Sequence, residues 1–210
     1  MRRLLLAILA LTLTSSLYAK GFKDHFKDAT LRIDYTFMGN ATEQYVALRE
    51  MSYTDNWYGR RINLDNVPLM GNGDLTLTDS VSGEVIYKTS FSSLFQEWIT
   101  TPEALELSKS FEFTLLVPMP HKKSVATLVL RDNTGKESIH KYTINPEDVL
   151  IRDRSNQKPL PYKYIHKGGD SKEAIDVVIL AEGYTAEQMD IFLNDAIITK
   201  KEILSYQPFS

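Results

Sequence analysis

The feature that most constrains the fold is a strict alternation of apolar and polar residues that begins after Thr30. Leu31, Ile33, Tyr35 and Phe37 are apolar, whereas the residues between them are polar. Successive side chains of a strand point to opposite faces, so this pattern places one face in a core and the other in solvent. The segment is therefore predicted to be a half-buried antiparallel strand.

The same alternation recurs further along the chain, with turn-forming residues between several of the runs. The further runs with strand character are residues 75–77, 85–87, 111–117, 125–130 and 138–144. Segments 79–83 and 132–136 are rich in Asp, Ser, Asn and Gly, which favour tight turns. Short strands with turns between them predict a mainly β fold, an antiparallel, immunoglobulin-like β-sandwich.

One segment within this region has helical rather than strand spacing. Phe91, Leu94, Phe95 and Trp98 recur at the intervals of a helix face. We expect residues 91–107 to cross one end of the sandwich as a short helix or an ordered loop.

The C-terminal part of the chain has a different pattern. Residues 176–180 form a run typical of a buried strand, and a turn leads from them into an amphipathic helix that ends near Leu204. Thr185 and Gln188 fit a capping box at the start of this helix. A parallel sheet needs several such strand-helix units, so we expect residues 173–210 to be the opening of a truncated α/β domain.

The amino terminus has the layout of an export signal. Arg2 and Arg3 precede an apolar stretch over residues 4–13, and small or polar residues lead to a predicted cleavage site near Ala19. An uncleaved anchor is the alternative, but the apolar run is shorter than the roughly 20 residues of a transmembrane helix. The predicted organisation is a signal peptide at 1–19, a β-sandwich at 20–150, a linker at 151–172 and the truncated domain at 173–210.

Charge and composition exclude several functions. The formal net charge is −3, and removal of the export signal makes it two units more negative. This acidic balance is unlike that of nucleic-acid-binding proteins, which show a basic stripe. The sequence has no cysteine, so it has neither disulfides nor a thiolate nucleophile or ligand.

The sequence contains no complete catalytic motif. Its four histidines are His25, His121, His140 and His166, and no H-E-x-x-H places two of them on one helix turn. His140 is interpreted as a packing residue because it shares a strand face with apolar neighbours. A G-x-S-x-G elbow and a phosphate-binding glycine loop are also absent.

Three other segments carry weaker signals. Glu182 falls where a parallel strand would end, the edge at which α/β proteins bind ligands, although a solvated turn carboxylate is the alternative. Residues 72–74, Asn-Gly-Asp, could suggest a calcium loop, but the alternate oxygen ligands and the distant bidentate Glu of an EF-hand are missing, so a turn before the strand at Leu75 is predicted. The stretch from Trp57 to Arg61 combines aromatic rings with guanidinium groups and is the best candidate for surface recognition, unless Trp57 is core and the arginines form a solvated rim.

Several long strings resemble one family, the bacterial "IgA peptidase" zinc metallopeptidases, family sixty-four of the metallopeptidases. Residues 176–185 (DVVILAEGYT) are similar to the opening of its catalytic domain. The strings similar to its N-terminal domain are residues 55–61 (DNWYGRR), 67–74 (VPLMGNGD) and 91–98 (FSSLFQEW). The resemblance covers nearly the whole chain after the export signal.

The resemblance implies a secreted or envelope-associated hydrolase with an accessory or positioning N-terminal domain. In the family, the zinc-binding H-E-x-x-H helix lies well downstream of the E-G-Y-T segment, and nothing in this chain matches it. We therefore assign no catalytic and no metal residue, leave the binding residues unknown, and expect the chain to be inactive alone, with zinc held only by full-length members.

The partners implied by the resemblance are the missing catalytic domain and a protein or peptide substrate. Nucleic acid is not expected as a partner, and a membrane is expected only through the export signal. The alternative function is a stand-alone secreted β-sandwich module that binds glycan or protein.

Overall fold

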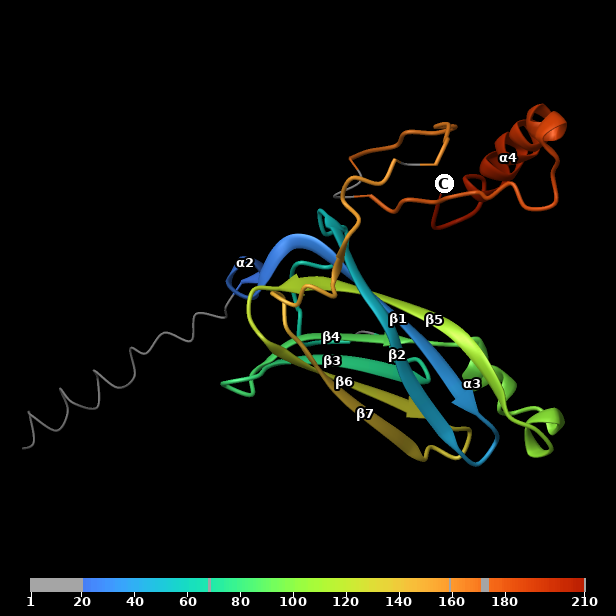
Figure 1. The fold of residues 1–210 in the computed structure, drawn as a ribbon. Helices are drawn as coiled ribbons and strands as arrows, with labels where there is room; N and C mark the ends of the chain where they lie inside the picture. The colour runs from blue at the N-terminus through green and yellow to red at the C-terminus, as the bar shows by residue number, and fades with distance from the viewer. Residues whose placement is uncertain (1–20, 68, 159, 171–173, 210) are drawn as a thin grey trace, which may run out of the picture. The chain divides into compact units, whose positions relative to one another are not determined.

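A computed structural model describes residues 21–67, 69–158, 160–170 and 174–209. The predicted export signal at 1–19 lies outside these residues. The described chain divides into two compact units, with the boundary between Asn156 and Gln157 (Figure 1). Each unit is described by itself.

The first unit is a sandwich of two four-stranded sheets, which confirms the predicted β fold. Its described strand pairs are antiparallel, except that β2 pairs with β8 in parallel. One sheet has the order β5 (Lys109–Pro120), β1 (Phe26–Gly39), β2 (Gln44–Asp55) and β8 (Arg152–Asp153). The other has the order β4 (Val85–Phe91), β3 (Gly73–Asp79), β6 (Ser124–Arg131) and β7 (Glu137–Ile144).

The core lies between the two sheets, as the alternating pattern predicts. Leu31, Ile33, Tyr35 and Phe37 of β1 are completely buried. Their partners from the opposite sheet include the buried leucines of β3 and β6. Burial of each such side chain contributes on the order of 2 kcal/mol, so the interface of the sheets dominates the stability of this unit.

Short helices cover the ends of the sandwich. Helix α2 (Phe22–His25) precedes β1, and α3 (Leu94–Trp98) with the 3-10 turn η1 (Pro102–Leu105) joins β4 to β5. The Ser93 hydroxyl accepts a hydrogen bond from the Gln96 amide at 3.2 Å and so caps α3. The predicted short helix in 91–107 is therefore present, and it buries Phe95 against the core.

The second unit contains the predicted C-terminal helix but not the predicted strand before it. The turn η2 (Ala186–Gln188) leads into α4 (Met189–Ile203), and the Thr185 amide donates to Gln188 Oε1 at 3.0 Å in the predicted capping box. Residues 175–181 carry no strand. The expectation of a strand at 176–180 is wrong for this chain, because the described residues of this unit offer no second strand to supply its hydrogen bonds.

The segment after β7 belongs to the first unit for longer than its composition suggests. The linker is predicted to begin at residue 151, yet Ile151 is buried in the core and β8 follows it directly. The segment stays with the first unit because β8 pairs in parallel with β2, a pairing that no pattern in the local sequence predicts.

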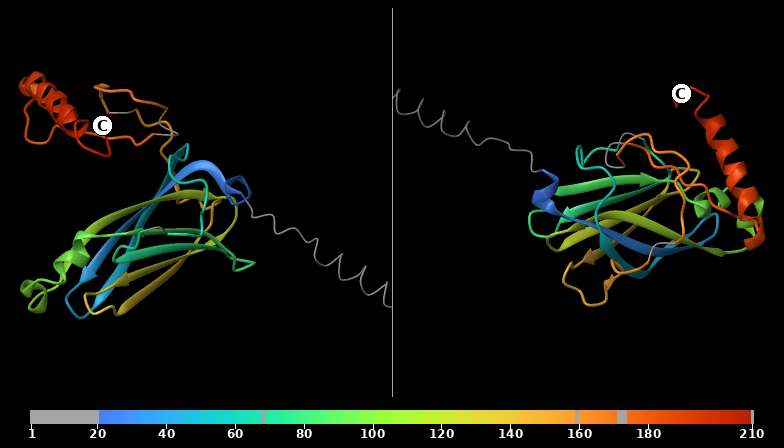
Figure 2. Two further views of the ribbon diagram at one scale, coloured as in Figure 1. Left: turned by 180° about the vertical axis from the view of Figure 1, so that it is seen from behind. Right: turned by 90° about the horizontal axis from the view of Figure 1, so that it is seen from above.

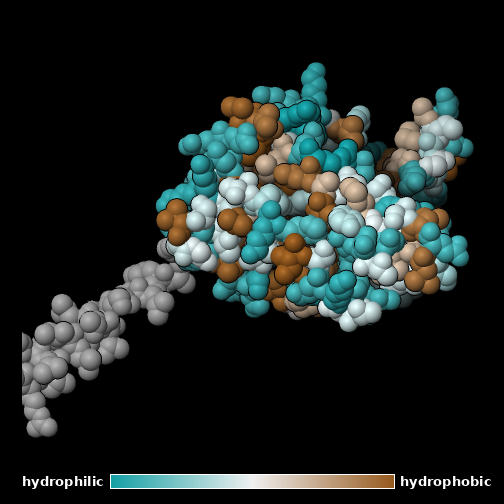
Figure 3. All heavy atoms as spheres, turned by 60° about the horizontal axis from the view of Figure 1, so that its bottom comes forward, coloured by the Kyte–Doolittle hydropathy of each residue, from teal (hydrophilic) through white to brown (hydrophobic). Residues whose placement is uncertain are grey.

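The surface of the molecule is mixed in character. On the face shown in Figure 3, hydrophobic residues are interspersed among hydrophilic ones. Figure 2 adds two views in which the strands of the two sheets of the first unit lie over each other. None of the helices in the described part of the chain combines the length and apolar character needed to cross a membrane.

Candidate functional site

Trp57, the aromatic centre of the predicted recognition loop, is part of the core. Only 6% of its surface is exposed, and its ring meets the edge of Tyr87 at 6.1 Å between centroids. Its indole Nε1 donates to the Arg60 carbonyl at 3.0 Å, and its amide donates to Asp28 Oδ1 at 2.9 Å. Because these polar groups of Trp57 are directed at the protein, its ring is not a surface anchor.

The Arg60 side chain holds the loop against the neighbouring strand. Its guanidinium donates to the carbonyl oxygens of Lys88 at 2.5 Å and Leu64 at 3.4 Å, and also to that of Asn66. It lies over the Tyr87 ring at 5.6 Å. The planar fork of arginine donors suits such multiple contacts.

Arg61 makes a second set of contacts on the other side of the loop. Its guanidinium donates to Asp28 Oδ1 at 2.6 Å and to the Trp57 carbonyl at 2.7 Å, and it lies 4.7 Å above the Phe22 ring. The expectation that the arginines form a solvated rim is therefore wrong, because both organise the loop. Of the aromatic residues in this stretch, Tyr58 remains 69% exposed.

Residues 72–74 lead into β3, as predicted. The Asn72 carbonyl accepts the Arg131 amide at 2.9 Å, and Asp74 pairs with the Arg131 guanidinium at 2.5 Å. Gly73 lies against the Phe91 ring so closely that a β-carbon would overlap it. These contacts support the predicted turn into a strand and not a calcium loop.

The neighbouring segment 91–98 joins the same network. Gln96 donates its side-chain amide to the carbonyls of Asn72 and Arg131, the latter at 3.0 Å, and the Ser93 amide donates to Asn72 Oδ1 at 3.3 Å. Asn72 and Gly73 therefore meet the segment 91–98 at one end of the sandwich. The strings of the sandwich that carry the family resemblance therefore contribute contacts that hold the fold.

The four histidines do not come together as a metal site. His25 and His121 are neighbours through a backbone hydrogen bond of 2.8 Å, but His121 Nε2 lies 3.2 Å from a backbone carbonyl and His25 Nε2 lies 3.9 Å from Glu84. His166 is exposed in the second unit. Among the described residues, no three His, Cys, Asp or Glu side chains lie where they could hold a metal ion. These residues do not fit a zinc site.

His140 instead contacts Ser138, a residue of its own strand β7 that bridges to β2. Its Nε2 lies 2.9 Å from Ser138 Oγ, whose proton is donated to the Gln44 carbonyl at 3.0 Å. Because the Ser138 hydroxyl proton is used in this bond, the His140 Nε2–H donates to the Ser138 hydroxyl oxygen. Burial lowers the pKa of His140, which favours this neutral ring.

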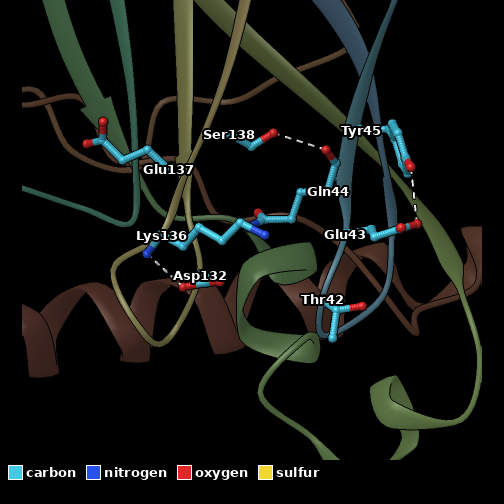
Figure 4. A pocket seen from close by; sticks show the side chains of 8 residues that line it. All are labelled: Thr42, Glu43, Gln44, Tyr45, Asp132, Lys136, Glu137 and Ser138. Carbon is cyan, nitrogen blue, oxygen red and sulfur yellow. Dashed lines mark hydrogen bonds between the residues drawn. The ribbon is translucent and has the colours of Figure 1, made fainter.

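A pocket of about 210 Å³ lies beside this bridge, between the β1–β2 and β6–β7 turns (Figure 4). Asp132 shapes one wall, because its Oδ1 accepts the amides of Thr134 at 2.8 Å and Lys136 at 2.9 Å. Burial alone would raise the pKa of Asp132, but these bonds and that of the Thr134 hydroxyl offset it and leave the pKa lowered. The pocket is lined by Thr42, Glu43, Gln44, Tyr45, Asp132, Lys136, Glu137 and Ser138.

The chemistry of this pocket is not that of a paired-carboxylate catalyst. In Figure 4 the side chains of Glu43 and Glu137 point to different sides of the pocket. Glu43 accepts the Tyr45 hydroxyl at 3.1 Å, and Glu137 accepts Arg131 Nε at 3.1 Å. Sequence reasoning identified the 132–136 turn but not the pocket, because the opposite wall comes from residues about 90 positions earlier.

Glu182 does not lie at the end of a parallel strand, the position that its interpretation as a ligand-binding residue requires. It is exposed in a turn, and no strand precedes it among the described residues of this unit. The structure therefore favours the solvated turn carboxylate.

The fold and these contacts define a β-sandwich domain whose characteristic sequence strings are engaged in structural networks. Residues 21–142 match the family model described as Peptidase M64 N-terminus. This match covers more than half of the chain, and the protein belongs to this family of metallopeptidases as an N-terminal domain. No curated protein matches the sequence.

Proposed function

We propose that this chain is the accessory N-terminal portion of an exported zinc metallopeptidase, where it positions a peptidase domain without supplying catalytic residues. The match of residues 21–142 to the N-terminal domain of the family carries this proposal. Zinc and proteolysis belong to the peptidase domain, and the partners of the chain are that domain and, through it, a protein or peptide substrate.

The distribution of polar contacts supports an accessory role. Arg60 and Arg61 bind backbone and carboxylate oxygens of the sandwich, and Gln96 binds the Arg131 carbonyl. Side chains committed in this way build a rigid body with defined ends. A rigid body is what a positioning domain requires, and function then depends on what is attached to it.

The proposal is tested with the purified chain by zinc analysis and by hydrolysis of fluorescent casein. We expect less than one zinc ion for every ten chains and a rate equal to that of buffer. Stoichiometric zinc, with hydrolysis that a chelator abolishes, would show that the chain has an active site of its own and would overturn the accessory role.

Export is the second part of the proposal, and residues 1–19 support it through their charge and hydropathy. Expression of the whole chain with its native start, followed by N-terminal sequencing of the exported product, tests it. We expect the product to begin at Lys20. A product that keeps Met1 and Arg2 would contradict a cleaved signal.

Binding of glycan or protein by the sandwich alone is the second candidate function, and the observation that favours it is Tyr58. This ring is exposed on a loop that Arg60 and Arg61 hold in place. Adsorption to immobilised mucin, a probe that offers both glycan and protein, should then fall at least fivefold in Tyr58→Ala. Equal adsorption of the variant and the parent chain would remove the loop from consideration.

A further inference from the structure

The chain returns to the sandwich after β7 and pairs once more before the second unit begins. In β8, Arg152 lies opposite Ser52 and Asp153 lies opposite Tyr53 of β2. The next amide, that of Arg154, donates to the Tyr53 carbonyl at 2.8 Å. The last segment of this unit is therefore attached to the sheet by only two paired residues and one further backbone hydrogen bond.

One carboxylate reinforces this attachment with two ion pairs. Glu50 Oε1 accepts the Arg154 guanidinium at 2.7 Å, and Glu50 Oε2 lies 3.3 Å from that of Arg152. About 30% of the side-chain surface is exposed for both Glu50 and Arg154. The Glu50–Arg154 pair is therefore partly shielded from solvent and counts for more than an exposed surface pair. The Arg152 side chain is 69% exposed, so its pair with Glu50 is the weaker of the two.

Arg154 also adds positive charge near a second carboxylate of the sheet. Glu50 lies opposite Asp34 of β1, and like charges across a strand pair repel each other. Asp34 is buried and accepts Arg32 Nε at 2.9 Å and the Thr114 hydroxyl at 2.5 Å. Burial would raise the pKa of Asp34, but the hydrogen bonds from Arg32 and Thr114, with a smaller contribution from the charge of Arg154, leave this pKa lowered. Arg154 thus pairs directly with Glu50 and acts on Asp34 through its charge alone.

We propose that Glu50, Arg152 and Arg154 form a latch that fixes the point at which the chain leaves the sandwich. The inference rests on the proposed positioning function and deepens it, because it names the residues that set where the following segment begins to pivot. With the latch closed, the free segment starts after Asn156, the boundary of the first unit. With the latch open, residues 152–156 join the free segment and extend its reach by roughly 17 Å, while Ile151 stays buried in the core.

Hydrogen exchange and trypsin cleavage of the whole chain test the latch. In Glu50→Gln, which keeps the shape but removes the charge, we expect the amides of residues 152–155 to exchange at least tenfold faster. Cleavage after Arg152 and Arg154 should accelerate by a similar factor relative to cleavage after Lys158, because a protease needs an extended substrate outside a sheet.

The matched control is Glu112→Gln, which removes an ion pair of 2.7 Å with Arg49 on the same sheet. It should change neither readout. Exchange in β1 and β3 reports whether a variant is still folded. If Glu50→Gln unfolds the sandwich, Arg152→Gln is the second variant, because it removes only the ion pair between Glu50 and Arg152. We expect it to speed amide exchange of residues 152–155 by at least threefold.

Exchange and cleavage at parental rates in a folded variant would overturn the latch. That outcome is distinct from failure of the proposed function, which depends on zinc and hydrolysis by the chain. A chain with its own peptidase activity would refute the accessory role and leave the latch intact.

Discussion

The two units of this chain use similar residues with opposite results. Leu31 and Ile33 of β1 are completely buried, because β2 and β5 pair with both edges of the strand and a second sheet covers its inner face. Val177 and Val178 belong to a run of the same character, yet they are 68% and 76% exposed and form no strand. A run of β-branched residues favours a strand, but the strand forms only where a neighbouring strand supplies hydrogen bonds and another layer covers its apolar face.

The helix of the second unit shows the other side of this comparison. Helix α4 forms where the sequence predicts it, although Ala196 alone of its described residues is buried. Its backbone hydrogen bonds are all local, and the capping box of Thr185 and Gln188 caps the 3-10 turn η2 that leads into it. A helix makes its backbone hydrogen bonds within one segment, whereas a strand needs a second segment that can lie far away in the sequence.

The sharpest way to break the comparison is amide exchange along the whole chain. A cooperative domain is stable by at least about 5 kcal/mol, so core amides of β1, β3 and β6 should exchange more than about 1,000-fold slower than residues 175–181. Strong protection of 175–181 would show that this segment has a partner and would contradict the contrast between the units.

The next largest effect is expected from Trp57. Trp57→Ala should lower the free energy of unfolding of the sandwich by about 3–5 kcal/mol, since it empties a core position. Tyr58→Ala, one residue further and exposed, should change it by less than about 0.5 kcal/mol. Denaturant melts of both variants measure the difference. Equal losses would contradict the assignment of Trp57 to the core.

Two glycines with positive φ compare the units directly. Gly39 has φ +135°, and a β-carbon there would overlap the Glu43 carbonyl, so Gly39→Ala should cost about 1–3 kcal/mol in a melt of the sandwich. Gly183 has φ +83°, and a β-carbon there would meet no atom within 4 Å. Gly183→Ala should shift the same melt by less than about 0.5 kcal/mol. A larger shift would mean that the units unfold together.

The smallest expected effect is a dependence on pH. Burial lowers the pKa of His140 below its usual 6.5, so the folded protein holds fewer protons than the unfolded chain below that pH. Stability should therefore fall as the pH drops through about 6.5, and His140→Gln should remove part of this fall. His166→Gln, an exposed position in the second unit, is the control. Identical pH profiles for both variants would exclude the buried ring as a source.

The recognition loop shows how far sequence reasoning reaches into the candidate site. The string from Trp57 to Arg61 identifies residues that matter, but their partners decide what they do. Arg60 bonds to Lys88, 28 positions later, and Arg61 bonds to Asp28, 33 positions earlier. The pocket of Figure 4 likewise joins turns about 90 residues apart. A local sequence pattern cannot predict contacts between residues that are separated by 28 to about 90 positions.

By itself, the sequence determined the β-sandwich, the short helix at its end, the C-terminal helix and the resemblance to the metallopeptidase family. These features rest on periodicity, turn and cap residues, and long strings, all of which are local. The tertiary structure alone decided that Trp57 is core, that its arginines are anchors, that β8 closes the first unit and that residues 176–180 form no strand. The physical reason is common to all four, because each depends on hydrogen bonds or packing between segments far apart in the chain.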